Sequence, residues 1–338
     1  MRQIATHQDI RSSSAMARSS PWPWARRNNA YDPPTPLDRF LSSPLRYLTA
    51  IIYAVVLRLR GAPFKARTDK PTIKIVCISD THTHIQDVPN GDVLIHAGDL
   101  TNAGTVEEIQ AQLDWLALLP HREKIVIAGN HDSYFDPKSR RVEDKGKKLN
   151  FGTVHYLENK AIALKFKGGR KLNFYGAPDI PKCGGSDHAF QYDRPHDPWQ
   201  NRIPLETDVL ITHTPPRYHL DLNLGCAGLL HEIWRVRPRL HVFGHIHSGH
   251  GQEAVFWDET QAAYERLMGG QRGGILADFL PGHAWWDALM VLYHGFKGIL
   301  WQRLMVGPRG GNGGLLVNAA LVYQSTTDVG NLPEVVEL

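Results

Sequence analysis

The chain has 338 residues, which is enough for one large domain with appendages or for two small domains. A hydrophobic fraction of 42% and a charged fraction of 21% are ordinary for a globular protein and exclude a mainly disordered, collagen-like or coiled-coil chain. A formal net charge of +4 over this length does not indicate specific nucleic-acid binding.

The N-terminal segment predicts a tail followed by a helix. We expect residues 1–45 to form a disordered tail, since Ser, Arg, Pro and Asn dominate its beginning without an apolar period. Residues 46–70 are expected to form an apolar and basic helical segment with a linker. Its uncharged run at 47–57 is shorter than the ~20 apolar residues that a membrane span requires. Three interpretations remain open: a helix packed on the domain, an interfacial membrane helix, or a signal anchor.

From residue 71 the pattern changes to short β-branched runs that end in polar, glycine-rich turns, as strands do. Between two of these runs, residues 105–119 predict a helix capped by Thr105. Near-continuous apolar strands separated by helices predict a sheet that is covered on both faces. The predicted strands span 73–78, 92–97, 124–128, 172–177, 208–212 and 240–243, with a late core strand at 315–323.

Residues 252–310 are expected to be a partly helical insertion, with a helical apolar period over 285–304. This helix and the run at 47–57 both carry aromatic residues beside Arg or Lys. Such residues favour the boundary between membrane and water. One hypothesis is that the two segments form a single apolar surface that docks on a membrane. The alternative is that they bury these faces in protein.

The three cysteines, Cys77, Cys183 and Cys226, are far apart and form no CxxC pattern. They predict reduced thiols, with Cys77 buried in a strand, and not a disulfide framework or a zinc finger. Reduced thiols favour a reducing compartment. We therefore expect an intracellular protein, either cytoplasmic or peripheral on a membrane. The sequence carries no indication of the oligomeric state.

Polar side chains follow five of the predicted strands at the point where each strand ends. In open α/β sheets this carboxyl edge is where ligands bind. Asp99 offers an anion that can bridge two metal ions, and imidazole and carboxylate ligands together suit Mn, Fe or Zn. The candidate metal ligands are Asp80, His82, Asp99, Asn130, His213, His245 and His247.

The ordered series DxH, GD, GNH(D/E), H and GHxH resembles the calcineurin-like metallophosphoesterase superfamily, and in particular its small MPPED-type proteins. The resemblance implies a four-layer α/β/β/α sandwich, built here from residues 71–251 and 311–338. It also implies two metal ions, one held by Asp80, His82, Asp99 and His247 and the other by Asp99, Asn130, His213 and His245. About sixty residues separate the GHxH motif from the last strands, which departs from the MPPED-type pattern.

The resemblance implies hydrolysis of a phosphate ester by a metal-bridging hydroxide, with His131 as the acid. Asp132 is expected to orient the His131 ring or to cap the next turn. Arg217 and His84 are candidates for binding substrate, although the favoured interpretation of Arg217 is a solvated loop residue. A phosphodiesterase is the leading hypothesis. A phosphomonoesterase or phosphoprotein phosphatase, and a metal-binding scaffold without activity, remain as alternatives.

Overall fold

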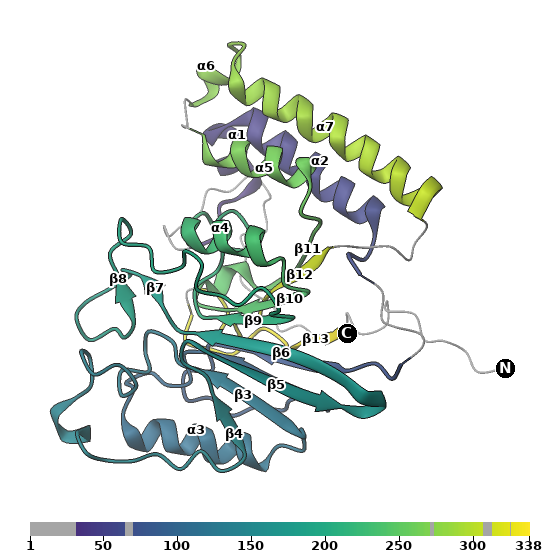
Figure 1. Ribbon diagram of the computed structural model, residues 1–338. Coiled ribbons are helices and arrows are strands. Elements are labelled where there is room, and N and C mark those ends of the chain that lie inside the picture. The colour runs from purple at the N-terminus through teal and green to yellow at the C-terminus, as the bar shows by residue number, and fades with distance from the viewer. Residues whose placement is uncertain (1–31, 65–69, 271–273, 307–312, 325) are drawn as a thin grey trace.

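Two β-sheets lie face to face at the centre of the molecule, with helices outside both of them (Figure 1). The computed structural model describes residues 32–64, 70–270, 274–306, 313–324 and 326–338. The four-layer α/β/β/α arrangement predicted from the sequence is confirmed.

The first sheet has five strands in the order β13-β1-β2-β3-β4. Strands β1 to β4 run parallel, and β13 pairs antiparallel with β1. The carboxyl ends of three central strands therefore meet at one edge, as predicted. The strands are β1 Lys74–Ile78, β2 Val93–Ala97, β3 Glu123–Ile127, β4 Val154–Tyr156 and β13 Glu334–Glu337.

The second sheet has six strands in the order β11-β12-β10-β9-β6-β5, with antiparallel strands at its two edges. They are β5 Lys160–Phe166, β6 Arg170–Ala177, β9 Val209–Thr212, β10 Leu240–Phe243, β11 Gly251–Val255 and β12 Gly314–Asn318. A short parallel pair, β7 Ile180–Pro181 and β8 Gln191–Tyr192, lies apart from both sheets. Two boundaries require correction. The insertion predicted at 252–310 begins with a strand of the sheet, and the strand predicted at 315–323 ends at Asn318, before the chain crosses to Ser79 through Ala320.

The apolar core is divided into layers by the two sheets. Between them lie fully buried side chains from both, among them Ile95 and Ile125 of the first sheet and Phe174 and Val242 of the second. Helix α3 (Val106–Leu118) packs on the outside of the first sheet and helix α4 (Ala227–Val236) on the outside of the second. The hydroxyl of Thr105 caps α3, as predicted. Three short 3-10 turns are η1 Val142–Asp144, η2 Lys167–Gly169 and η3 His247–Gly249.

Five helices from two distant parts of the chain pack together beyond the second sheet, and we call them the helical subdomain (Figure 1). They are α1 Pro36–Ser42, α2 Pro44–Arg60, α5 Glu259–Gly269, α6 Gly274–Asp278 and α7 His283–Trp301, which continues into a π-turn, η4 Gln302–Val306. The predicted disordered tail, 1–45, is wrong at its end, because α1 and the first turn of α2 lie there. A capping box at Thr35 and Pro36 at the first helical position explain why this polar segment forms a helix. Residues 1–31 and 65–69 lie outside the described residues.

Buried polar contacts fix the helical subdomain to the second sheet. Arg60 at the end of α2 forms a 2.7 Å ion pair with Asp258 and lies 3.8 Å from the centre of the Phe256 ring. His219 is completely buried between Glu253 of β11, at 2.9 Å, and Glu265 of α5, at 3.0 Å.

None of the helices in the described ranges is long and apolar enough to cross a membrane.

Candidate metal centre

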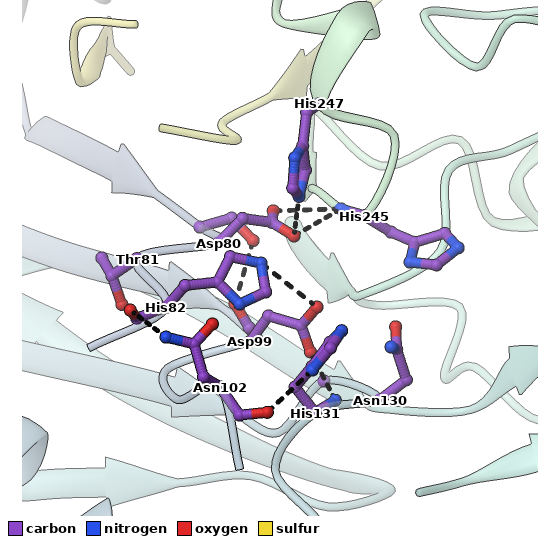
Figure 2. A network of polar contacts seen from close by, with 12 residues as sticks. Asp80, Thr81, His82, Asp99, Asn102, Asn130, His131, His245 and His247 are labelled. Carbon is purple, nitrogen blue, oxygen red and sulfur yellow. Dashed lines mark hydrogen bonds and ion pairs between the residues drawn. The ribbon is translucent and has the colours of Figure 1, made fainter. Parts of the chain in front are cut away.

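The structure brings all seven predicted metal ligands to one place, where the carboxyl ends of strands from both sheets meet. Figure 2 labels all of them except His213. They follow β1, β2, β3, β9 and β10, the five strands from which they were predicted. Three groups of side chains that could hold a metal lie there, and two of them are built from predicted ligands alone. The third consists of His82, Asp99 and His131.

The first group is Asp80, His82 and His247, whose donor atoms all lie within 4.8 Å of one another. Asp80 Oδ1 is 3.3 Å from His247 Nε2. The second group is Asp99, His213 and His245, with the same spacing. Asp99 Oδ2 lies 3.3 Å from His213 Nε2 and 3.8 Å from His82 Nε2, so this carboxylate stands between the groups.

Asn130 joins the second group through its side-chain oxygen. Oδ1 of Asn130 lies 3.0 Å from His213 Nε2. The opposite nitrogen, His213 Nδ1, contacts the carbonyl of Ala97 at 2.9 Å, which fixes the orientation of the ring.

Two carboxylates are buried among these histidines without a Lys or Arg beside them among the described residues. Burial alone would raise the pKa of the Asp80 and Asp99 carboxyls, but His247 and His213 respectively hold both pKa values well below the usual range. Burial also opposes a charge on His213, yet the nearby Asp99 raises its pKa to about 9. Burial lowers the pKa of His245 to about 3, so this ring is neutral and able to bind a metal.

The backbone at the site is strained at four of the ligands. Asp80, His82, Asp99 and His245 have φ values of 53°, 46°, 53° and 66°, in the left-handed region that non-glycine residues avoid. Each such residue costs on the order of 1–3 kcal/mol, and residues of this kind cluster at functional sites.

Two glycines allow the loops to approach one another this closely. A Cβ at Gly129 would lie 2.2 Å from Asp99 Oδ1, and a Cβ at Gly244 would lie 2.1 Å from Asp80 Oδ2. Any side chain at either position would displace a candidate ligand.

The donor set fits a divalent metal site. It combines carboxylate oxygens, imidazole nitrogens and an amide oxygen, the mixture that suits Mn, Fe or Zn in an open catalytic site. Buried anionic carboxylates also require a compensating cation. The free Cys183 and the buried Cys226 and Cys77 belong to neither group of ligands in the described structure.

His131 lies beside the ligands and at the edge of the cavity described below. Its Nδ1 is 2.9 Å from the carbonyl oxygen of Asn102, and its ring centre lies 4.9 Å from that of His82 (Figure 2). The backbone N–H of His131 donates to Asp99 Oδ1 at 2.8 Å. The ring is therefore oriented by a carbonyl of the neighbouring loop.

The prediction that Asp132 orients the His131 ring is wrong in this structure. Asp132 is completely buried, and its two oxygens accept hydrogen bonds from the backbone of Leu100, Thr101 and Gly129 and from the Thr101 hydroxyl. Its carboxylate points into the protein because four donors in the two ligand loops lie there. Asp132 therefore holds the Asp99 and Asn130 loops together and has no role in the cavity.

A cavity of about 570 Å³ opens in front of the metal ligands. His84 lines it, as predicted for a substrate-binding residue, and its Nε2 contacts the carbonyl of Thr327 at 2.9 Å. Arg217 is not brought to the cavity. Its guanidinium lies 5.4 Å from the centre of the Tyr218 ring, and Arg217 does not belong to the lining of the cavity.

Three residues that sequence reasoning missed line this cavity: Asn102, His188 and Arg194. Asn102 follows Asp99 by three residues in the same loop, which is the signal that could have identified it. The other two lie between short strands in a stretch with no recognisable motif. His188 Nδ1 is nevertheless 3.4 Å from Asn130 Nδ2, and the guanidinium of Arg194 donates to the carbonyls of Leu224 and Gly225.

A second, larger groove of about 1390 Å³ shares His245 and His247 with the cavity. It extends to the start of the helical subdomain, where Leu41 and Tyr47 line it. The metal ligands are thus reached both from the cavity and along this groove.

Comparisons with known proteins agree with this geometry. The model of the calcineurin-like phosphoesterase family matches residues 73–249. The UPF0046 protein C25E10.12 of Caenorhabditis elegans is 39% identical over 202 residues, which cover 53% of this chain and 70% of that protein. Human metallophosphoesterase domain-containing protein 1 is also 39% identical, over 53% of this chain and 61% of its own length.

A longer alignment joins this chain to a protein of Emericella nidulans named probable rhamnogalacturonate lyase C. It is 39% identical over 260 residues, or 76% of this chain, but the chain spans only 23% of that protein. Among solved structures, the crystal structure of TT1561 of Thermus thermophilus is 14% identical with a TM-score of 0.39, over 55% of this chain and 86% of that one.

Proposed function

Because the chain belongs to the calcineurin-like phosphoesterase family, we propose that it is a metal-dependent phosphoesterase with two metal ions and a preference for phosphodiesters. The observation that carries the proposal is the place of Asp99 between two groups of Asp and His side chains at one end of a cavity, 3.3 Å from His213 of one group and 3.8 Å from His82 of the other. A single carboxylate between two groups of donors is the arrangement that a two-metal site requires.

One ion would be held by Asp80, His82, Asp99 and His247, and the other by Asp99, Asn130, His213 and His245. The donors suit Mn, Fe or Zn. When bound, such ions lower the pKa of a coordinated water and neutralise phosphate oxygens.

His131 would act as the proton donor to the leaving oxygen. Its Nδ1–H donates to the carbonyl of Asn102, which leaves Nε2 to carry the transferable proton on the side of the cavity. The fixed carbonyl also keeps the ring from rotating during the transfer. Acid catalysis by a positioned side chain typically contributes about 10²–10⁴ in rate.

The lining of the cavity supports a diester substrate. Besides the metal ligands, the described lining contains one lysine, Lys182, and one arginine, Arg194. Ile180, Leu224 and Val322 form apolar walls. These walls would accommodate the second ester group.

The proposal is tested by comparing two substrates after metal analysis of the purified full chain. We expect chelator-treated protein reloaded with manganese to hydrolyse bis(p-nitrophenyl) phosphate faster than p-nitrophenyl phosphate, with Asp99→Ala as the inactive control. Faster turnover of the monoester would replace the diesterase with a phosphomonoesterase. Full metal occupancy without turnover of either substrate would support a metal-binding scaffold.

A further inference from the structure

The outer faces of α2 and α7 expose large apolar side chains at helical spacing. On α2 these are Leu48, Ile51, Val55 and Leu59, each between 45% and 52% exposed. On α7 the exposed fractions range from 43% to 68%, for Trp285, Trp286, Leu289, Leu292, Tyr293, Phe296, Leu300 and Trp301. We call these two sets together the apolar surface. Within each set the exposed residues recur mainly at every third or fourth position, so each set forms a stripe along its helix.

The folding of the helical subdomain does not account for this surface. The opposite faces of the same helices are already packed, with Tyr53 and Val56 of α2 and Ala288 and Val291 of α7 all buried. A helix that is apolar on all sides is normally covered on all sides. Here α2 and α7 lie side by side at the outer end of the molecule, away from the sheets (Figure 1).

Exposed apolar residues are concentrated in this part of the chain. Of the 24 large hydrophobic residues that are exposed in the described ranges, 18 lie within 40–59 or 276–304. The six others are Ile85, Leu118, Val142, Leu205, Leu224 and Leu332, which are distributed along the rest of the described chain. Scattered apolar residues are normal, but a concentrated patch marks an interaction site.

Basic residues beside the apolar surface favour a partner with negative charge. Arg58, Lys297 and Arg303 are exposed there. Helix α2 contains no acidic residue, and the one acid of α7, Asp287, accepts a hydrogen bond from Arg266 of α5 at 3.0 Å. The surface therefore combines apolar side chains with positive charge that its own helices do not neutralise.

Aromatic residues lie at both ends of α7, with Trp285 and Trp286 at its start and Trp301 at its end. Trp and Tyr are enriched at membrane–water interfaces, and basic residues are attracted to anionic headgroups. A second copy of this chain would bring one cationic surface against another, which costs energy.

We propose that the apolar surface docks the protein peripherally on an anionic phospholipid bilayer. The helices α2 and α7 lie along the interface, with Trp286 and Phe296 inserted among the acyl chains and the basic residues at the headgroups. The metal centre stays in the aqueous phase, since it lies at the strand ends of the sheets.

Vesicle flotation of the full chain tests this proposal. We expect the protein to float with phosphatidylcholine vesicles that contain phosphatidylserine, and less with phosphatidylcholine alone or at high salt. Replacing two exposed side chains, in Trp286→Glu/Phe296→Glu, should lower the bound fraction about tenfold or more. The charge variant Lys297→Glu/Arg303→Glu should lose the preference for phosphatidylserine.

The matched control is Leu118→Glu, which places the same charge on α3 at a side chain that is 86% exposed and far from the helical subdomain. It should float like the wild type. All variants should retain the wild-type thermal melt and hydrolysis of a soluble diester. Wild-type protein that stays soluble with both vesicle types, or an equal loss in Leu118→Glu, would overturn the proposal. So would a wild-type dimer in light scattering that Trp286→Glu/Phe296→Glu converts to a monomer, since a second copy would then cover the surface.

Discussion

The metal centre and the apolar surface both depart from the usual placement of side chains, in which charged groups are exposed and apolar groups are buried. The metal centre buries carboxylates and imidazoles, with Asp80 and Asp99 at most 2% exposed. The apolar surface exposes tryptophan and phenylalanine, with Trp286 and Phe296 more than 60% exposed. For each departure we have proposed a partner outside the chain: a cation in the first case and a phospholipid bilayer in the second.

The two regions also differ in what holds them in place. The metal ligands sit on short loops that strands of a shared core fix at both sides, with glycines and strained φ values that leave little freedom. The apolar surface belongs to helices from two distant segments, which polar contacts of Arg60 and His219 fix to the sheet. Substitutions in one region should therefore leave the other unchanged, and the following predictions test this independence.

The largest effect is expected from loss of the shared ligand. Asp99→Ala should reduce diester hydrolysis by more than about 100-fold, because even the loss of a residue that only supports a metal ligand costs 10–100-fold. His213→Ala should have a similar effect, since its Nε2 lies 3.3 Å from Asp99. Metal content measured by mass spectrometry should fall in both variants, while flotation with anionic vesicles should remain unchanged. Loss of flotation in Asp99→Ala would show that the regions are coupled.

His131→Ala separates chemistry from metal binding at the same site. We expect kcat to fall by roughly 10²–10⁴ while both ions remain bound, because the ring is held by the Asn102 carbonyl and the seven predicted ligands do not include it, although it lies near His82 and Asp99. Metal analysis alongside single-turnover rates makes the distinction. If the variant loses metal as completely as Asp99→Ala, His131 is a ligand and not the acid.

The metal centre was accessible to sequence reasoning because every predicted ligand lies within four residues of the carboxyl end of a strand. A strand end fixes the position of the next two or three residues, so Asp80, Asp99 and His245 could be placed from local pattern alone. His188 and Arg194 could not, since they reach the cavity from the loops before and after β8, whose paths depend on distant contacts. Asp132 shows a second limit: its neighbour His131 faces the cavity, but four backbone and hydroxyl donors turn its own side chain inward.

The helical subdomain was predicted only in part. The apolar periods of α2 and α7 indicated helices, and the structure confirms that the two segments are neighbours and that the tryptophans of α7 are exposed. The expected exposure of the aromatic residues in the first segment is wrong for Tyr53, which is buried and stacks on Tyr264 of α5. Helix periodicity cannot tell which of two apolar faces is packed, because that depends on partners elsewhere in the chain, here α5. Whether a membrane covers the outer face stays a prediction.

The junction that fixes the helical subdomain should weaken at alkaline pH. Burial opposes a charge on His219, but the carboxylates of Glu253 and Glu265 raise its pKa from 6.5 to about 10. Because the folded pKa is the higher one, the stabilisation is complete below about pH 6.5 and is lost as the pH rises toward about 10. We expect the free energy of unfolding to fall over this range by on the order of a few kcal/mol. The melting temperature should therefore fall by several degrees. In His219→Gln the fall should be smaller.

His241→Gln is the matched control for that experiment. His241 is also a completely buried histidine, but burial lowers its pKa to about 3, so it is neutral throughout the same pH range. Its replacement should leave the pH dependence of the melting temperature as in the wild type. If the melting temperature of His219→Gln falls as steeply with rising pH as that of the wild type, groups other than His219 cause the fall.

The smallest expected effect is a change in KM when Arg194 is replaced, compared with no change when Arg217 is replaced. Arg194 lines the cavity, and its guanidinium is held by the carbonyl oxygens of Leu224 and Gly225, so it is positioned to meet the single charge of a diester. Exposed charge pairs contribute about 0.2–1 kcal/mol, so Arg194→Ala should raise KM by up to about fivefold with little change in kcat. Arg217, which packs over the Tyr218 ring outside the cavity, should have no such effect when replaced by alanine. Steady-state kinetics with bis(p-nitrophenyl) phosphate measures both variants. An equal rise in KM for Arg217→Ala would mean that the loop after the Thr-Pro-Pro motif closes over bound substrate, and would restore the role predicted for Arg217 from its position after a ligand.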